Sequence, residues 1–160
     1  MGRIEVGDAI LVSGPVGDHG IAVLLAWEKS ELQGKLQFGT SRVPSITRAL
    51  LLLRELHFMR GSIRRIFVTV PHEIHRGTGF GIRLRQSDIP VRDSVQTVCE
   101  ILGYDPLYLV YEGRVMVVVD PSEADEALAV FRPAEGDQEA ESVGTVEGVS
   151  QRQAPSRQAT

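Results

Sequence analysis

Two runs of β-branched and aromatic residues lie close together in the sequence, and they constrain the fold more than any other feature. The runs are Leu107–Tyr111 and Val115–Val119, joined through Glu112-Gly113-Arg114. Such residues favour strands, and a short glycine-containing link between two strands is typical of a β-hairpin. We therefore predict that the two runs pair antiparallel. Alternation along each strand predicts two shared faces, one of Val115, Val117 and Val119 and one of Leu107, Leu109 and Tyr111.

The remaining segments alternate between strand and helix patterns. Short apolar or alternating runs predict strands at Ala9–Val12, Phe80–Leu84 and Ser142–Val146. Helical spacing predicts four helices, at about 21–27, 44–57, 92–102 and 122–131. Their expected end signals are Asp18, Ser45 and Ser122 as N-caps and Gly103 as a C-terminal stop. Helices mixed with a hairpin predict an α+β fold, a two-layer sandwich with a mixed or antiparallel sheet and helices packed on it.

Length and composition limit the class of protein. The 160 residues suffice for one domain, which we place at residues 1–147, and the polar segment 148–160 is predicted to be a disordered tail. Residues 134–160 hold −3 of the net charge of −4, so the near-neutral body gives no reason to expect nucleic acid. No apolar run is long enough for a membrane helix. A single cysteine, Cys99, excludes an internal disulfide and multi-cysteine metal sites, and we expect a cytoplasmic protein.

A glycine-rich loop, Gly14-Pro15-Val16-Gly17-Asp18-His19-Gly20, lies between a predicted strand and a predicted helix. The backbone N–H groups of a helix N-terminus suit an anion. The loop matches neither the Walker A pattern nor the dinucleotide fingerprint, so a tight structural turn is favoured over a phosphate site. His19 is a candidate acid, base or ligand, against the simpler role of a hydrogen-bonded turn histidine.

Other polar groups have simpler explanations on local evidence. His72-Glu73-x-His75 lacks the i, i+4 spacing of a helical zinc pair, so no metal site is predicted. A basic cluster could hold a phosphate or could be a solvated face; it consists of Arg60, Arg64, Arg65 and Arg76. Cys99 lies on the apolar face of its helix and is predicted to be an inert core thiol. Glu112, in a turn, has no local feature that makes it a general base.

Taken together, three stretches resemble the C-terminal domain of the hydrogenase maturation protein HypE family. They are the segment 6–24 with its Gly-Asp-His-Gly, the segment 79–92, and Cys99–Tyr108 followed by Glu112-Gly113. The resemblance covers about residues 5–147. It implies membership of the aminoimidazole-ribonucleotide synthetase-like (PurM) group, whose members pair an N-terminal nucleotide-binding, dimer-forming domain with a C-terminal α+β domain.

The resemblance also implies a chemistry. The family uses ATP with magnesium to dehydrate a thiocarbamoyl group on its own C-terminal cysteine. The resulting thiocyanate supplies the cyanide ligand of nickel–iron hydrogenases. A HypF carbamoyltransferase supplies the carbamoyl group, and the HypC–HypD complex receives the cyanide. By this resemblance Glu112 and His19 are the catalytic candidates, and Asp18, Arg60 and Arg64 belong to the phosphate and nucleotide region.

Three departures from the family pattern qualify this expectation. The chain begins where the family's second domain begins, and it lacks the family's cysteine-bearing C-terminal end. The family's Arg-Asp-Pro-Thr-Arg-Gly-Gly motif is Arg60–Ile66 here, with Gly61-Ser62 in place of its acid and proline and Arg65-Ile66 in place of its two glycines. A short frame disturbance is one hypothesis for that segment, because the resemblance resumes on both sides. We predict that it forms no working phosphate cradle.

We therefore predict a HypE-type maturation factor that does not make thiocyanate alone. Three alternatives stay open: a non-catalytic interaction or scaffold module derived from this domain, half of a split enzyme that pairs with a separate ATP-binding chain, and another ATP-dependent enzyme of the superfamily. Homodimerisation is a further possibility. No partner of the nucleic-acid or membrane class is expected.

Overall fold

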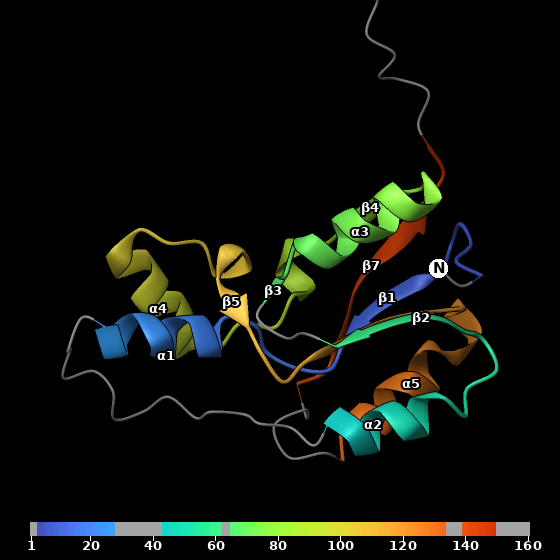
Figure 1. The fold of residues 1–160 in the computed structure, drawn as a ribbon, viewed down its shortest axis with the longest axis horizontal. Helices are drawn as coiled ribbons and strands as arrows, with labels where there is room; N and C mark the ends of the chain where they lie inside the picture. Colours follow the sequence, from blue (N-terminus) through green and yellow to red (C-terminus); the bar gives the residue numbers. More distant parts are fainter. Residues whose placement is uncertain (1–2, 28–42, 62–64, 134–138, 150–160) are drawn as a thin grey trace, which may run out of the picture.

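The computed structural model describes residues 3–27, 43–61, 65–133 and 139–149. Its centre is a five-stranded sheet in the order β2-β6-β1-β7-β4, in which every neighbouring pair is antiparallel (Figure 1). The strands are β1 (Ala9–Val12), β2 (Leu56–Gly61), β4 (Gly81–Leu84), β6 (Val115–Val119) and β7 (Glu141–Glu147). A separate two-stranded sheet pairs β3 (Arg65–Ile66) with β5 (Val110–Tyr111).

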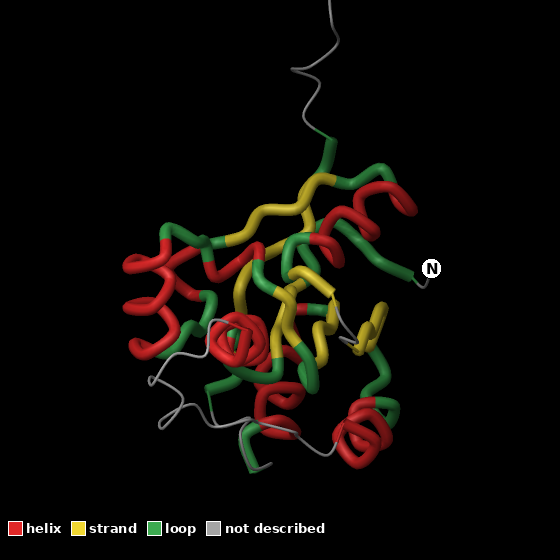
Figure 2. Tube along the Cα trace, turned by 60° about the vertical axis from the view of Figure 1, so that its left-hand side comes forward, coloured by secondary structure: helices red, strands yellow, loops and turns green. Residues whose placement is uncertain are grey.

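Helices cover both faces of the five-stranded sheet, as the tube view shows (Figure 2). On one face, α3 (Thr69–Thr78) packs Val70 and Ile74 against the even-numbered residues of β1 and β6. On the other face, α2 (Val43–Leu50) and α5 (Ala124–Phe131) pack against the odd-numbered residues. Every residue of β1 and β6 is consequently buried, and alternation along a strand serves two cores at once.

A third apolar cluster lies beside the sheet. It joins α1 (Asp18–Trp27) to α4 (Asp93–Leu102) through Ile21, Leu25, Val95 and Cys99. The helix α4 ends as predicted, because Gly103 has a φ of 73° and its N–H returns to the carbonyl of Cys99. None of the helices in the described ranges is long and apolar enough to span a bilayer.

The predicted α+β sandwich with an antiparallel sheet is confirmed, and so are most of its strands, but helices on both faces make three layers where two were predicted. The strand β1 has the predicted bounds Ala9–Val12, and β4 lacks only Phe80 of the predicted run. The strand β7 is one residue longer at each end than the predicted 142–146. Val115, Val117 and Val119 share one face of β6, as predicted. The strand β7 ends at Glu147, and the predicted disordered tail falls almost wholly outside the described residues.

The predicted hairpin is wrong. The segment Pro106–Tyr108 is a 3₁₀ turn, because the Asp105 carboxylate accepts a hydrogen bond from the N–H of Leu107 at 2.9 Å. Leu107, Leu109 and Tyr111 therefore do not share a strand face. Only Val110–Tyr111 is extended, and it pairs with β3, whereas β6 lies between β1 and β2. Because the residues on both faces of β6 are buried, this strand lies inside the main sheet and does not pair with β5, its neighbour in sequence.

Two helix predictions also need correction. The helix expected over 44–57 ends at Leu50, and Leu56–Gly61 is a strand because it pairs with β6 along its length. The helix expected from Ser122 begins at Ala124, after a 3₁₀ turn in which Asp120, not Ser122, accepts the capping hydrogen bond. Asp18 lies in the first turn of α1 and does not cap a helix that starts at Ile21.

A candidate active site at one end of the sheet

One end of the main sheet gathers the residues that the sequence singles out. There β1 and β2 end and β6 begins, with Val12 opposite Met116 and Gly61 opposite Val115. The loop after β1 and the link before β6 therefore meet. Tyr111, next to Glu112, pairs with Arg65 of β3, so the altered Arg60–Ile66 segment leaves the main sheet near Val115 and returns beside Glu112.

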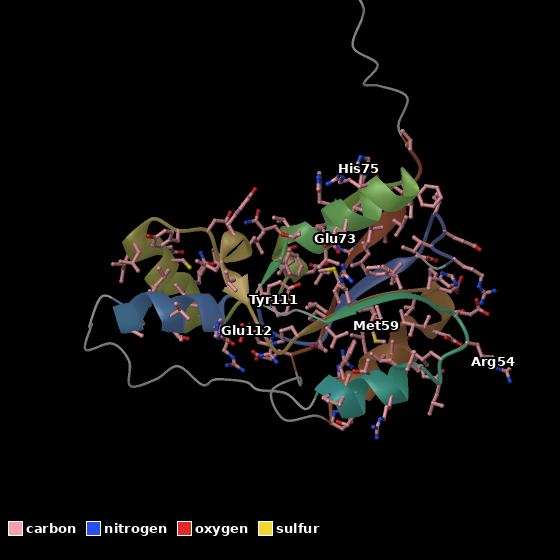
Figure 3. All side chains as sticks on the ribbon, in the orientation of Figure 1. Arg54, Met59, Glu73, His75, Tyr111 and Glu112 are labelled. Atoms are coloured by element: carbon pink, nitrogen blue, oxygen red, sulfur yellow. The ribbon has the colours of Figure 1, made fainter. Side chains whose placement is uncertain are left out.

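His19 and Glu112 face one another at this end. His19 is the second residue of α1, and Glu112 follows β5 directly, as Figure 3 shows for Tyr111 and Glu112. The distance from His19 Nε2 to Glu112 Oε2 is 3.7 Å, and the two side chains are 33% and 37% exposed. This separation is longer than a hydrogen bond. The structure thus brings together the two catalytic candidates, which lie 93 positions apart in the sequence.

The pair opens on a pocket of about 770 Å³. Apart from His19 and Glu112, the pocket is lined by Gly20, Val23, Leu24, Tyr104, Tyr108, Leu109 and Val110. Tyr104 and Tyr108 keep much of their side chains exposed. An apolar pocket with one convergent acid–base pair is the usual form of a small-molecule or peptide site.

Beneath the pair, the loop after β1 is hydrogen-bonded to the start of β6. The N–H of Ser13 donates to the carbonyl of Val115 at 2.9 Å, and the N–H of Val115 donates to Ser13 Oγ at 3.0 Å. Arg114 is 2% exposed, and its Nε donates to the carbonyl of Pro15 at 2.9 Å. A buried guanidinium must have partners, and this one is held inside the loop that leads to His19.

Asp18 provides the charge that faces Arg114. Its Oδ2 lies 3.2 Å from Arg92 Nη1 and 3.7 Å from Arg114 Nη2. Burial raises the pKa of the Asp18 carboxyl. Arg92 and Arg114 lower this pKa and Glu139 raises it, each more weakly than burial does. This carboxylate is therefore enclosed among cations of the same chain.

Two glycines of the loop serve packing. Gly17 has a φ of 91°, which favours glycine, and a Cβ there would lie 2.9 Å from Val95 Cγ1. A Cβ on Gly20 would lie 2.7 Å from Leu109 Cβ and 2.9 Å from the carbonyl oxygen of Val110. The helix α1 consequently contacts β5 backbone to backbone at Gly20. These contacts favour the structural interpretation of the glycine-rich loop.

The basic cluster contributes less than its sequence suggests. Arg60 Nη2 lies 3.0 Å from Glu73 Oε2 on α3, so its charge is already paired. Arg64 lies outside the described residues, only the backbone of Arg65 is described, and Arg76 is exposed in the last turn of α3. Within the described part of the chain, no set of three or more metal-binding side chains occurs. The described members of the predicted phosphate region, Asp18 and Arg60, thus do not fit a magnesium–nucleotide cradle.

The two histidines of His72-Glu73-x-His75 lie on α3, away from the pocket, and Figure 3 shows Glu73 and His75 there. His75 Nδ1 is 2.7 Å from the carbonyl oxygen of Phe80, which ties the helix to the residue before β4. Cys99 is fully buried between α1 and α4, and burial raises the pKa of its thiol, as expected for an inert core cysteine.

Sequence reasoning missed the second histidine–carboxylate pair of the molecule. His57 Nδ1 lies 2.7 Å from Asp8 Oδ2, and both side chains are almost fully buried. His57 Nε2 also lies 3.4 Å from Glu55 Oε2. Burial lowers the pKa of His57, but the hydrogen bonds to Asp8 and Glu55 outweigh it and raise the pKa overall. Sequence reasoning also missed Arg114, whose only signal is an arginine at the start of a fully apolar strand.

The chain matches a known family. The family described as "AIR synthase related protein, C-terminal domain" matches residues 67–153. The chain belongs to this family. Thiamine monophosphate kinase from Aquifex aeolicus shares the fold at 14% identity, with a TM-score of 0.61.

Nearer relatives confirm the resemblance to HypE. Carbamoyl dehydratase HypE of Cupriavidus necator is 33% identical over 141 residues, which are 88% of this chain and 40% of that protein. HypE of Escherichia coli is 32% identical over 128 residues, 80% of this chain and 38% of that protein. A crystal structure of HypE superposes with a TM-score of 0.87 at 31% identity, over 93% of this chain and 47% of the other. The chain therefore spans two fifths of these curated relatives.

Proposed function

We propose that this chain supplies the proton-accepting half of a HypE-type carbamoyl dehydratase, acting in the cytoplasm in synthesis of the cyanide ligand of nickel–iron hydrogenases. The observation that carries the proposal is the His19–Glu112 pair, 3.7 Å apart at the mouth of an apolar pocket, in a domain whose relatives are named carbamoyl dehydratases.

Dehydration of a thiocarbamate needs a base beside the amide nitrogen. In the proposed reaction the amide oxygen leaves as part of inorganic phosphate after transfer of a phosphoryl group from ATP, and the nitrogen loses both protons as the C≡N bond forms. The Glu112 carboxylate accepts one proton from that nitrogen, and the second leaves on the released phosphate. His19 lies on the opposite side of the same opening and holds the carboxylate toward the substrate.

The thiocarbamate cannot be carried by Cys99, the only cysteine of these 160 residues. Its side chain is fully buried, and it packs with Ile21 and Val95 between two helices. Modification would require α1 and α4 to separate, and the raised pKa of the thiol further disfavours the reactive thiolate. The 160 residues alone are therefore proposed to make no thiocyanate.

ATP with magnesium is proposed to be held largely by another polypeptide segment. A relative named HypE has been solved in complex with ATP, and this chain covers 44% of it. In the described residues, Arg60 is paired with Glu73 and Asp18 is enclosed by Arg92 and Arg114. The segment that supplies the nucleotide site is either continuous with this domain or a separate ATP-binding chain.

Partners follow from the same proposal. A HypE–HypF complex superposes on this chain with a TM-score of 0.84 at 32% identity, which supports a HypF carbamoyltransferase as the carbamoyl donor. The HypC–HypD complex is the proposed cyanide acceptor. A homodimer is a further proposed assembly.

One observation favours a second candidate function, a non-catalytic interaction module. Tyr104 and Tyr108 line the pocket and leave much of their surface exposed. Exposed aromatic residues around a pocket also suit protein recognition.

A chimera separates the two candidates. This chain replaces the matching region of Cupriavidus necator HypE, which supplies the remaining ATP-binding and cysteine-bearing parts. The chimera is mixed with a HypF carbamoyltransferase, carbamoyl phosphate and ATP, and the modified cysteine is identified by mass spectrometry. We expect thiocyanate from the chimera, its loss in Glu112→Gln, and its retention in Glu100→Gln, an exposed acid on α4. A folded chimera that forms thiocarbamate and never thiocyanate would support the interaction module instead.

The 160-residue chain is tested in the same mixture and by calorimetry. We expect an unmodified Cys99 and no micromolar ATP binding. Cyanated Cys99, or micromolar ATP binding that is lost in Arg64→Ala, would contradict the proposal that the chain needs a further polypeptide.

A further inference from the structure

Each catalytic candidate has neighbours in sequence that contact the neighbours of the other. Asp18 precedes His19, and Arg114 follows Glu112 by two residues; their side chains approach to 3.7 Å. Gly20 follows His19, and Val110 precedes Glu112 by two residues. Their backbones lie so close together that a Cβ on Gly20 would be 2.9 Å from the Val110 carbonyl oxygen. The contact between His19 and Glu112 thus lies between two other contacts of the same two segments.

One of the two bracketing contacts, that of Asp18 with Arg114, is far more buried than the pair it adjoins. Asp18 and Arg114 are 8% and 2% exposed, whereas the side chains of His19 and Glu112 are about one third exposed. Arg114 is further held by the carbonyl of Pro15 at 2.9 Å. A half-exposed ion pair contributes little energy and cannot by itself hold two segments in register. A buried charged pair and a backbone contact can.

We propose that Asp18, Gly20 and Arg114 are positioning residues that set the distance between His19 and Glu112. Asp18 thereby takes a role other than phosphate binding, and Arg114 acquires one that the sequence did not suggest. The functional consequence of this proposal rests on the proposed role of Glu112 as the proton acceptor. The proposal that these residues set the distance between His19 and Glu112 does not depend on that role.

Arg92 provides a matched control. It also pairs with Asp18, at 3.2 Å, but it lies before α4 and its other partner is Glu139 at 3.2 Å. Arg92 therefore has the same charge as Arg114 and shares its partner Asp18. Neither of these two ion pairs of Arg92 involves the link that carries Glu112. Loss of Arg92 tests whether any change of charge at Asp18 disturbs the pair.

The experiment measures the imidazole ring resonances of the full, isotope-labelled chain by NMR. In the wild-type background, Glu112→Gln is expected to shift the His19 ring resonances, because the carboxylate lies 3.7 Å from Nε2. The same substitution is then made in Asp18→Asn, Arg114→Lys and Gly20→Ala. We expect each of these backgrounds to lose most of the His19 response, and Arg92→Met to keep it. The His57 ring, at the other end of β2, reports that the fold is intact.

Three outcomes would overturn the proposal: no His19 response in the wild-type background, a response kept in all three bracket variants with native His57 resonances, or an equal loss in Arg92→Met. If Arg114→Lys fails to fold, Asp18→Asn and Gly20→Ala, which act on opposite sides of the pair, still decide. The readout needs no catalysis. An inactive chimera with an intact His19 response would therefore count against the proposed function alone.

The chimera supplies the functional readout. For a positioning role, Asp18→Asn is expected to lower kcat for thiocyanate formation while leaving the KM for ATP near that of the parent chimera, because a positioning residue does not bind the nucleotide. A nucleotide-binding role for Asp18 predicts the reverse, a raised KM, and that result would overturn the proposal for this residue.

Discussion

The two ends of strands β1 and β2 each carry a histidine–carboxylate pair, and the two pairs differ in nearly everything except residue type. Where the strands begin, His57 and Asp8 are 2.7 Å apart and almost completely buried. Where the strands end, His19 and Glu112 are 3.7 Å apart, half-buried and open to a pocket. The first pair is structural, since Asp8 also accepts a hydrogen bond from the N–H of Glu5. The second leaves room for another molecule.

The difference shows that burial, rather than residue type, separates a structural pair from a candidate catalytic one. A buried ion pair is strongly coupled to stability, because either partner alone would be left uncompensated. An exposed pair is nearly neutral for stability and remains accessible. The following predictions test this contrast, from the largest expected effect to the smallest.

Asp8→Ala is expected to destabilise the protein by about 3–5 kcal/mol, because it leaves His57 buried without its closest partner. Urea unfolding of the full chain measures this value. Glu112→Ala, at the other pair, is the matched control and should change the unfolding free energy by no more than about 0.5 kcal/mol. Equal effects of the two substitutions would show that burial does not distinguish the pairs.

Gly20→Ala is expected to cost about 1–3 kcal/mol, because the new methyl group would meet Leu109 Cβ and the Val110 backbone within 3 Å. Gly61→Ala is its control: nothing lies within 4 Å of a Cβ at Gly61, which is exposed at the end of β2. Its expected change is within about 0.5 kcal/mol. Thermal unfolding of both variants measures the difference, and a tolerated Gly20→Ala would mean that α1 and β5 can move apart cheaply.

The His57 cluster predicts a pH dependence of stability. The pKa of His57 is raised in the folded state, so its stabilising contribution is full below about pH 6.5, the unfolded value, and is lost as pH rises through the folded value. The groups that act on His57 are Asp8, Glu55 and Glu5. Urea unfolding between about pH 6 and about pH 9 should show a decline that His57→Gln removes. An identical decline in that variant would assign the effect to other groups.

Glu112→Gln should have the smallest effect on stability, within about 0.5 kcal/mol, and the greatest effect on chemistry. The side chain is 37% exposed, so its charge contributes little to folding, whereas the proposed proton transfer depends on it. Parallel urea unfolding and thiocyanate formation in the chimera measure both quantities. A strongly destabilised Glu112→Gln would place this pair with the structural one.

Local patterns predicted elements well where one face of one segment decided the structure. The helix α4 was predictable because its apolar positions repeat and Gly103 supplies the left-handed residue that ends it. The strand β1 was predictable because a short apolar run between polar turns suits a buried strand. His19 and Glu112 were predicted as site residues through family resemblance, since nothing local distinguished either from a solvated turn residue.

Pairing partners were not predictable in the same way. The strand β6 follows β5 after three residues, and yet it lies between β1 and β2, because its two apolar faces are both buried only inside the sheet. Leu56 and His57 continue the helical apolar spacing that begins at Ile46, but hydrogen bonding to the open edge of β6 makes Leu56–Gly61 a strand. Both corrections arise from contacts between residues more than fifty positions apart, which a local pattern does not contain.

The sequence by itself determined the α+β class, the family, the positions of most helices and strands, and the inert character of Cys99, because each depends on periodicity, composition or a shared motif. Only the tertiary structure decided which strands pair, that Asp18 is enclosed by Arg92 and Arg114, and that His57 forms a buried pair with Asp8. The physical reason is that burial and electrostatic partners are properties of a packed chain. His19 and His57 therefore acquire different environments, one half-buried and one almost fully buried, only when the sheet assembles around them.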